Sequence, residues 1–184
     1  MSYSNTLQAS LPFITGVSFE TDAHAGRLCV RDAGGELRAA TEAEIVSAAL
    51  EVTAQACVRG TALCDPRATQ AYLRLRLAEL PHEIFGLIHL DNRHRVLAFE
   101  VLFRGTINGA NVYPRDVVRS VLEKNAAATI FFHNHPSGVP TPSPSDELIT
   151  RRLKEALALV EVRVLDHIVV GAEGCESFAE RGLL

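Results

Sequence analysis

Apolar residues from about position 84 onward occur in two patterns, short runs and a helical repeat, which distinguish strands from helices. Short runs rich in apolar residues predict strands at four places: residues 84–90, 95–103, 126–132 and 162–171. Apolar residues at helical spacing predict two helices: one from about Pro114 to Asn125, and one that opens near Ser143. The order strand, strand, helix, strand, helix, strand predicts an α/β layered domain over residues 81–184.

The sequence pattern of residues 1–80 predicts a small α+β appendage before this domain. Short strand-like pieces occur twice: at residues 16–20 and 27–31. Thr41 and Glu44 form a capping-box pattern that opens a helix. A second helix is predicted to have Asp65 as its N-cap and Pro66 at its first position.

The composition is that of an ordinary folded protein. The chain has 184 residues, 47% of them hydrophobic, which is enough to bury one sizeable core. A formal net charge of −4 and a pI near 6.0 give no global electrostatic footprint for nucleic acid. No apolar run approaches the roughly 20 residues of a membrane span, and the N-terminus lacks a basic signal-peptide start. We therefore expect a bacterial cytoplasmic protein without membrane association.

The four cysteines are widely spread and form no Cys-x-x-Cys pair. The sequence therefore indicates neither a zinc ribbon nor a disulfide scaffold. We expect the cysteines to serve as small, buried hydrophobic residues.

Two histidines and an aspartate surround a proline-rich loop after the third predicted strand. His133 and His135 are two positions apart, so in an extended segment their side chains project to one side and can aim at one point. Asn134 would then face away. Asp146 lies in the first turn of the helix that opens near Ser143. This arrangement predicts a metal site formed by His133, His135 and Asp146.

A structural interpretation accounts for part of the same pattern. Ser143 and Asp146, with Pro144 between them, form a capping box, and capping alone would explain all three residues. A single histidine in or after a strand, such as His167, is more often structural than a ligand. Capping does not explain two histidines that share one side of a strand, which favours the metal site.

The set of ligands indicates which metal is bound. Two neutral imidazoles and one carboxylate oxygen suit zinc. Three protein ligands, rather than four, leave a coordination position for water, as catalytic sites require. Zinc lowers the pKa of such a water to about 7, which provides hydroxide near neutral pH.

The pattern His-x-His, seven residues, Ser-x-x-Asp resembles the JAMM motif of the JAB/MPN metalloprotease superfamily, with Ser143 as its serine. The fuller string His-Asn-His-Pro-Ser-Gly, followed by Pro-Ser-x-x-Asp, resembles the RadC branch of that superfamily. Supporting matches lie in five further segments: residues 103–106, 113–117, 125–128, 165–167 and 177–180. Residues 1–82 lack the helix-hairpin-helix signature of full-length RadC proteins, so the chain is more similar to short RadC-like proteins of bacterial mobile elements.

The resemblance implies a JAB/MPN fold, similar to that of cytidine deaminases, in which helices flank a layered mixed sheet. It implies zinc binding by the two histidines and the aspartate, and oxyanion stabilisation by Ser143. It also implies a catalytic glutamate just before the first core strand, where Glu83 stands. Glu100 on the next predicted strand is the alternative, because spacing alone does not separate the two.

We expect a zinc-dependent hydrolase of the JAMM metallopeptidase type that acts on a peptide or isopeptide bond of a protein substrate. Zinc and base chemistry would serve a deaminase or a phosphodiesterase equally, so the peptide assignment comes from the resemblance. One alternative is a DNA-associated accessory protein of repair, recombination or mobile-element maintenance, with a secondary zinc site and weak, salt-dependent DNA binding. Another is a module that binds a protein tail without cutting it, against which the intact motif argues.

Overall fold

The computed structural model of the chain describes residues 19–22, 27–31, 35–54, 60, 66–78, 80–105 and 111–184. The chain divides into two compact units, Met1–Val52 and Thr53–Leu184. Within the described ranges, no helix is both long enough and apolar enough to cross a lipid bilayer.

The N-terminal unit contains a three-stranded antiparallel sheet and the start of a helix. The elements are β1 (Phe19–Asp22), β2 (Arg27–Arg31), β3 (Leu37–Ala39) and α1 (Glu42–Ala54). In the predicted capping box, the Thr41 hydroxyl accepts the Glu44 N–H at 3.3 Å and the Glu44 carboxylate accepts the Thr41 N–H at 2.9 Å. β2 and the start of α1 are confirmed, whereas the strand predicted at 16–20 lies partly outside the described residues. All three residues of β3 are exposed, so no apolar pattern predicts it.

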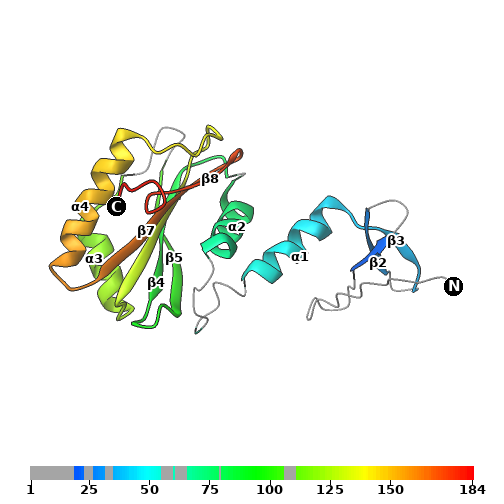
Figure 1. Cartoon of the computed structure of the whole chain (residues 1–184), viewed down its shortest axis with the longest axis horizontal. Helices are drawn as coiled ribbons and strands as arrows, with labels where there is room; N and C mark the ends of the chain where they lie inside the picture. The colour runs from blue at the N-terminus through cyan, green and yellow to red at the C-terminus, as the bar shows by residue number, and fades with distance from the viewer. Residues whose placement is uncertain are drawn as a thin grey trace. The chain divides into compact units, whose positions relative to one another are not determined.

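The C-terminal unit is built on a five-stranded mixed sheet with the strand order β5-β4-β6-β7-β8 (Figure 1). Its strands are β4 (Ile84–Leu90), β5 (Val96–Arg104), β6 (Ala128–Asn134), β7 (Arg163–Gly171) and β8 (Gly174–Ser177). β6 and β7 run parallel, and the other neighbouring pairs run antiparallel. The predicted α/β class and the four predicted strands are confirmed.

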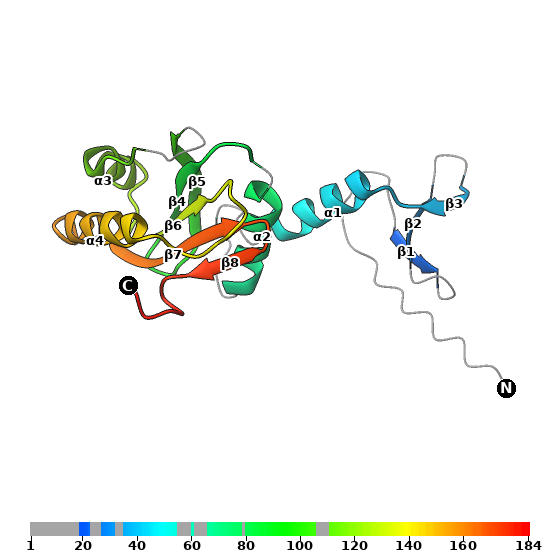
Figure 2. The same cartoon turned by 90° about the horizontal axis from the view of Figure 1, so that it is seen from above.

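Helices cover both faces of this sheet. They are α2 (Pro66–Leu77), α3 (Pro114–Glu123) and α4 (Pro144–Ala158). Figures 1 and 2 show α3 and α4 on one side of the sheet and α2 on the other. Leu73 of α2 packs in one core with Ile88 of β4, and Leu153 of α4 packs in a second core with Leu87 of β4. Successive residues of a strand face opposite sides, so β4, which is buried along its whole length, supplies both cores.

The compact C-terminal unit begins earlier than the division predicted near residue 80. α2 packs on β6, β7 and β8 and contributes Leu73 and Leu77 to the core on that face. Helical periodicity identifies the apolar side of a helix but not the sheet that this side covers. Pro66 begins α2 as predicted, while Asp65, its predicted N-cap, lies outside the described residues.

Two strands differ from the sequence expectation. β6 continues to Asn134, two residues past its predicted end, because His133 and Asn134 still pair with Val169 and Val170 of β7. β8 has no apolar run that predicts it, since it is short and begins at Gly174. It exists because it pairs with β7.

Candidate metal centre

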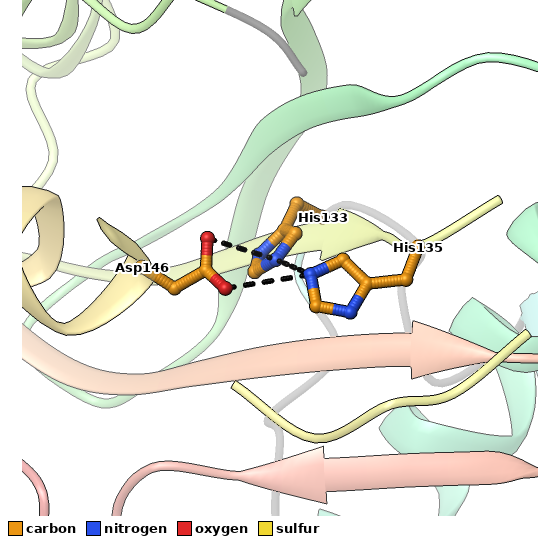
Figure 3. A group of neighbouring side chains, drawn as sticks. All are labelled: His133, His135 and Asp146. Carbon is orange, nitrogen blue, oxygen red and sulfur yellow. Dashed lines mark hydrogen bonds and ion pairs between the residues drawn. The ribbon is translucent and has the colours of Figure 1, made fainter. Parts of the chain in front are cut away.

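The three predicted ligand residues meet where β6 ends and α4 begins. His133 is the second-last residue of β6, His135 follows the strand, and Asp146 lies in the first turn of α4. Figure 3 shows the Asp146 carboxylate facing both imidazole rings. The Nε2 atoms of the two histidines are 2.9 Å apart, and they lie 3.5 and 3.4 Å from the carboxylate oxygens. One potential ligand atom of each residue therefore lies within 4.8 Å of the other two.

The His135 ring is oriented by the proline-rich loop. Its Nδ1 lies 2.9 Å from the Val139 carbonyl oxygen. A carbonyl oxygen only accepts hydrogen bonds, so Nδ1 carries the proton and Nε2 directs its lone pair toward the other two residues. A metal-binding imidazole needs this arrangement.

Close backbone packing holds this loop against the end of β7. The Gly138 carbonyl accepts the Glu173 N–H at 3.0 Å, and a Cβ on Gly171 would overlap that carbonyl. Gly138 itself has a φ of +90°, which glycine adopts without strain. A side chain at position 171 would therefore displace the segment that carries Val139.

Asp146 is held in its ionised form. Burial opposes the charge and is the largest single effect, but the two neighbouring imidazoles and the hydrogen bonds from Ser143 outweigh it and hold the pKa of the carboxyl well below its ordinary value. Interaction with the Asp146 carboxylate in turn raises the pKa of His135, against the effect of burial. The site therefore favours a cation among these atoms, either a proton on an imidazole or a metal ion.

Ser143 forms the N-cap of α4 and completes a capping box. Its Oγ accepts the Asp146 N–H at 3.2 Å, and both its N–H and its hydroxyl donate to Asp146 Oδ2 at 2.7 Å. The capping interpretation is therefore confirmed. The same bonds orient the carboxylate toward the imidazoles, so capping and ligand placement are not alternatives here.

A cavity of about 500 Å³ opens beside the three residues. Its other walls include Glu83, Asn111, Val112, Ser143, Leu148, Ile149 and Arg152. Glu83 stands directly before β4, and its backbone carbonyl accepts the Gly105 N–H at 2.8 Å. A carboxylate on this wall is placed to exchange a proton with a molecule bound in the cavity.

Asn134 holds the two residues on either side of Glu83. Its side chain is turned away from the histidine pair, and its Oδ1 accepts the Ile84 N–H at 2.8 Å while its Nδ2 donates to the His82 carbonyl at 3.1 Å. The residue between the two histidines therefore ties the end of β6 to the segment that carries Glu83. Alternation predicts that Asn134 faces away, but no sequence signal indicates a partner 50 positions earlier.

Glu100, the alternative base, belongs to a different cluster. Its carboxylate accepts the Ser120 hydroxyl at 2.7 Å and lies 3.2 Å from His89 Nε2. None of these three residues is among those that line the cavity beside the histidine pair. The structure therefore places Glu83, and not Glu100, at the cavity beside the histidine pair.

His167 lies directly behind His133. It is completely buried, and burial is the largest of the effects that hold its pKa well below the ordinary value. Its Nε2 lies 2.8 Å from His133 Nδ1, and its Nδ1 lies 2.6 Å from the Thr150 hydroxyl. Both ring nitrogens thus have protein partners, as expected for a structural histidine. The sequence contains no signal that pairs it with His133.

Comparison with protein families identifies the domain. A family model described as a RadC-like JAB domain matches residues 63–183. The chain belongs to this family. The RadC-like domain accordingly includes α2, in agreement with the packing of that helix on the five-stranded sheet. The resemblance drawn from the histidine-containing motif is confirmed.

Several proteins are similar over most of the chain. A UPF0758 protein of Nitrosococcus oceani is 50% identical over 190 residues, which cover 92% of this chain and 84% of the relative. A UPF0758 protein of Vibrio cholerae is 57% identical over 143 residues, which cover 78% of this chain and 90% of the relative. Another, of Thioalkalivibrio sulfidiphilus, is 62% identical over 130 residues, which cover 71% of this chain and 58% of the relative.

Proposed function

We propose that this protein is a zinc-dependent hydrolase that cleaves a peptide or isopeptide bond. The observation that carries the proposal is the convergence of two imidazole nitrogens and a carboxylate at a cavity whose wall also includes Glu83 and Ser143. Membership of the RadC-like JAB family supports it, because the motif of this chain resembles that of the JAMM metalloproteases.

The donor set fits a catalytic zinc ion. His133 and His135 would bind it through Nε2 and Asp146 through a carboxylate oxygen. Oδ1 of Asp146 is the better ligand atom, because Oδ2 already accepts two hydrogen bonds from Ser143. When bound, zinc supplies Lewis-acid polarisation of the substrate carbonyl and lowers the pKa of a water to about 7.

Glu83 would act first as a general base and then as a general acid. Its carboxylate would accept a proton from the attacking water and later deliver that proton to the nitrogen of the leaving amine. The hydrogen bonds of Asn134 to the residues on either side of Glu83 restrict the backbone at this point. Restricted motion keeps the carboxylate close to the geometry that proton transfer needs.

Ser143 would donate a hydrogen bond to the substrate carbonyl oxygen as negative charge develops there. Its hydroxyl donates to Asp146 Oδ2 in the structure, so this role requires the hydroxyl hydrogen to turn toward the substrate. That rotation leaves two bonds in place, namely the bond from the Asp146 N–H to Oγ and the bond from the Ser143 N–H to the carboxylate.

The remaining wall of the cavity suits a peptide segment. Val112, Leu148 and Ile149 provide an apolar surface, and Arg152 adds a positive charge. An apolar wall with a few polar groups can hold a side chain next to the bond to be cleaved and orient it.

Hydrolysis of linear and isopeptide-linked peptides by the purified, zinc-loaded chain tests the proposal. We expect cleavage of at least one class, its loss when a chelator removes zinc, and its recovery when zinc is restored. Parallel assays with a cytidine nucleoside and a phosphodiester serve as controls. A zinc-loaded protein that acts on either of these but on no peptide would overturn the peptide assignment.

A further inference from the structure

We infer that His167 and Thr150 are positioning residues that set the tautomer of His133, so that its Nε2 lone pair points into the metal site. The inference rests on the proposed zinc site, since it assigns these residues a role toward that ion. It follows from counting donors and acceptors along one continuous chain of buried contacts.

The Thr150 hydroxyl contacts two acceptors or donors at short distance. Its Oγ1 lies 2.5 Å from the Asp146 backbone carbonyl oxygen and 2.6 Å from His167 Nδ1. A hydroxyl has one proton to donate, and a carbonyl oxygen can only accept. The Thr150 proton therefore goes to the carbonyl, and the remaining contact requires His167 Nδ1 to donate.

The ring of His167 is neutral in this environment. It is completely buried and stacks on Phe178 with a centroid distance of 4.7 Å, and it makes a T-shaped contact with the ring of Phe131. An apolar enclosure of this kind disfavours an imidazolium. A neutral ring with its proton on Nδ1 has a lone pair on Nε2, so His167 accepts at that atom.

The contact with His167 fixes which nitrogen of His133 carries the proton. Its Nδ1 lies 2.8 Å from His167 Nε2, so it must donate, and its own Nε2 is left with a lone pair. That nitrogen is the one that lies 2.9 Å from His135 Nε2 and 3.5 Å from the Asp146 carboxylate. His135 reaches the same tautomer through the Val139 carbonyl. Two different acceptors, an imidazole and a carbonyl, thus produce two equivalent ligands.

Asp146 lies at both ends of this series of contacts. Asp146 offers its carboxylate to the metal site and its backbone carbonyl to Thr150, one turn further along α4. Displacement of the first turn of α4 would therefore disturb the carboxylate and the support of His133 together.

The test compares zinc affinity, measured by competition with a chelator, in matched pairs of variants. Thr150→Val removes the hydroxyl at nearly constant volume, and Thr150→Ser keeps it. His167→Leu removes the acceptor, whereas His167→Gln keeps an amide oxygen near the position of Nε2. We expect the Val and Leu variants to bind zinc about 10- to 100-fold more weakly and the Ser and Gln variants to recover much of the affinity.

Thr129→Val is the control for a purely structural effect. Thr129 is also completely buried, and its hydroxyl donates to the Ile88 carbonyl at 3.1 Å, outside the chain of contacts around His167. We expect its zinc affinity to stay within about twofold of wild type, in contrast to the effect of losing an outer partner of a ligand. Equal losses in Thr129→Val and Thr150→Val, or no loss in Thr150→Val and His167→Leu, would overturn the inference.

A second measurement does not depend on zinc. Nitrogen-15 spectra of the histidine rings in zinc-free protein, at about pH 8 where free imidazoles are neutral, report the tautomers directly. We expect protonated Nδ1 atoms on His133 and His167. A neutral His133 ring with its proton on Nε2 would refute the inference. Failure of the wild-type chain to bind zinc would instead refute the proposed function, while the spectra would still report on the tautomers.

Discussion

His89 and His167 are both completely buried in the C-terminal sheet, and they differ in how their nitrogens are used. Both nitrogens of His167 have partners, namely His133 and Thr150. His89 Nε2 meets both Glu100 and Ser120, while its Nδ1 has no hydrogen-bond partner among the described residues. Each histidine thus lies in a cluster with a hydroxyl and, directly or through a second histidine, a carboxylate.

The difference shows that proximity of an imidazole, a carboxylate and a hydroxyl does not by itself make a metal site. The cluster around His89 offers one imidazole and one carboxylate, and Ser120 already donates to that carboxylate. At the end of β6, two imidazoles and a carboxylate point at one another beside an open cavity. The two clusters therefore differ in the number of lone pairs that they offer and in whether these point at one position.

The largest effect is expected from removing a ligand. His133→Ala should lower the zinc content from about one ion per chain to near none, because two ligands do not hold a catalytic zinc ion. His89→Gln should keep full zinc content. Elemental analysis of the folded proteins checks both. A folded His133→Ala protein that retains zinc would place the site elsewhere.

Glu83→Gln should keep zinc and lower turnover by about 10²- to 10⁴-fold, because an amide cannot accept the proton of water. Glu100→Gln is the matched control, since Glu100 belongs to the cluster of His89, and its turnover should stay near that of wild type. Measurement of peptide turnover together with zinc content shows which glutamate acts as the base. Loss of zinc in Glu83→Gln would make Glu83 a ligand instead, and loss of activity only in Glu100→Gln would transfer the role of base.

Ser143→Ala should lower turnover by about 10²-fold, as for the loss of an oxyanion donor, at unchanged zinc content. It should also destabilise the fold by about 1 kcal/mol through loss of the helix cap. Thr41→Ala removes the corresponding cap of α1 and should show a similar stability cost without any change in turnover. Full turnover in Ser143→Ala would restrict the serine to capping.

Asn134→Ala should lower turnover by roughly tenfold while zinc content stays the same, because the segment of Glu83 loses its side-chain support. Stability should fall by about 1–3 kcal/mol, since the Ile84 N–H is left without its buried acceptor. Thr129→Val, which removes a different buried bond of β6, should affect stability but not turnover. Equal turnover losses in both variants would indicate a general loosening of the strand.

The smallest effect concerns the acid sensitivity of His89. Burial lowers its pKa from 6.5, helped by Lys124 and opposed by Glu100. The unfolded chain then binds a proton below pH 6.5 that the folded protein excludes, so this histidine makes folding stability fall as the pH drops through that range. Denaturant unfolding of zinc-free His89→Gln should show a shallower fall of stability below about pH 6.5 than wild type. An identical slope would mean that His89 does not contribute.

Local patterns were enough to determine much of this protein. Apolar runs identified β4, β6 and β7, because a strand with helices packed on both faces of its sheet is rich in apolar residues on both faces. The spacing of His133 and His135 and the capping box of Asp146 indicated the metal site, since each depends only on the repeat of one strand or the first turn of one helix.

The rest depended on pairings between distant segments. The parallel pairing of β6 with β7 brings His167 behind His133, although 34 positions separate them. Packing of α2 on the sheet, the pairing of β8 and the hold of Asn134 on the segment of Glu83 are likewise non-local. Sequence periodicity reports which side of an element is buried but not which partner covers it. For that reason only the tertiary structure placed Glu83 at the cavity and Glu100 in the cluster of His89, and only it brought His167 into contact with His133.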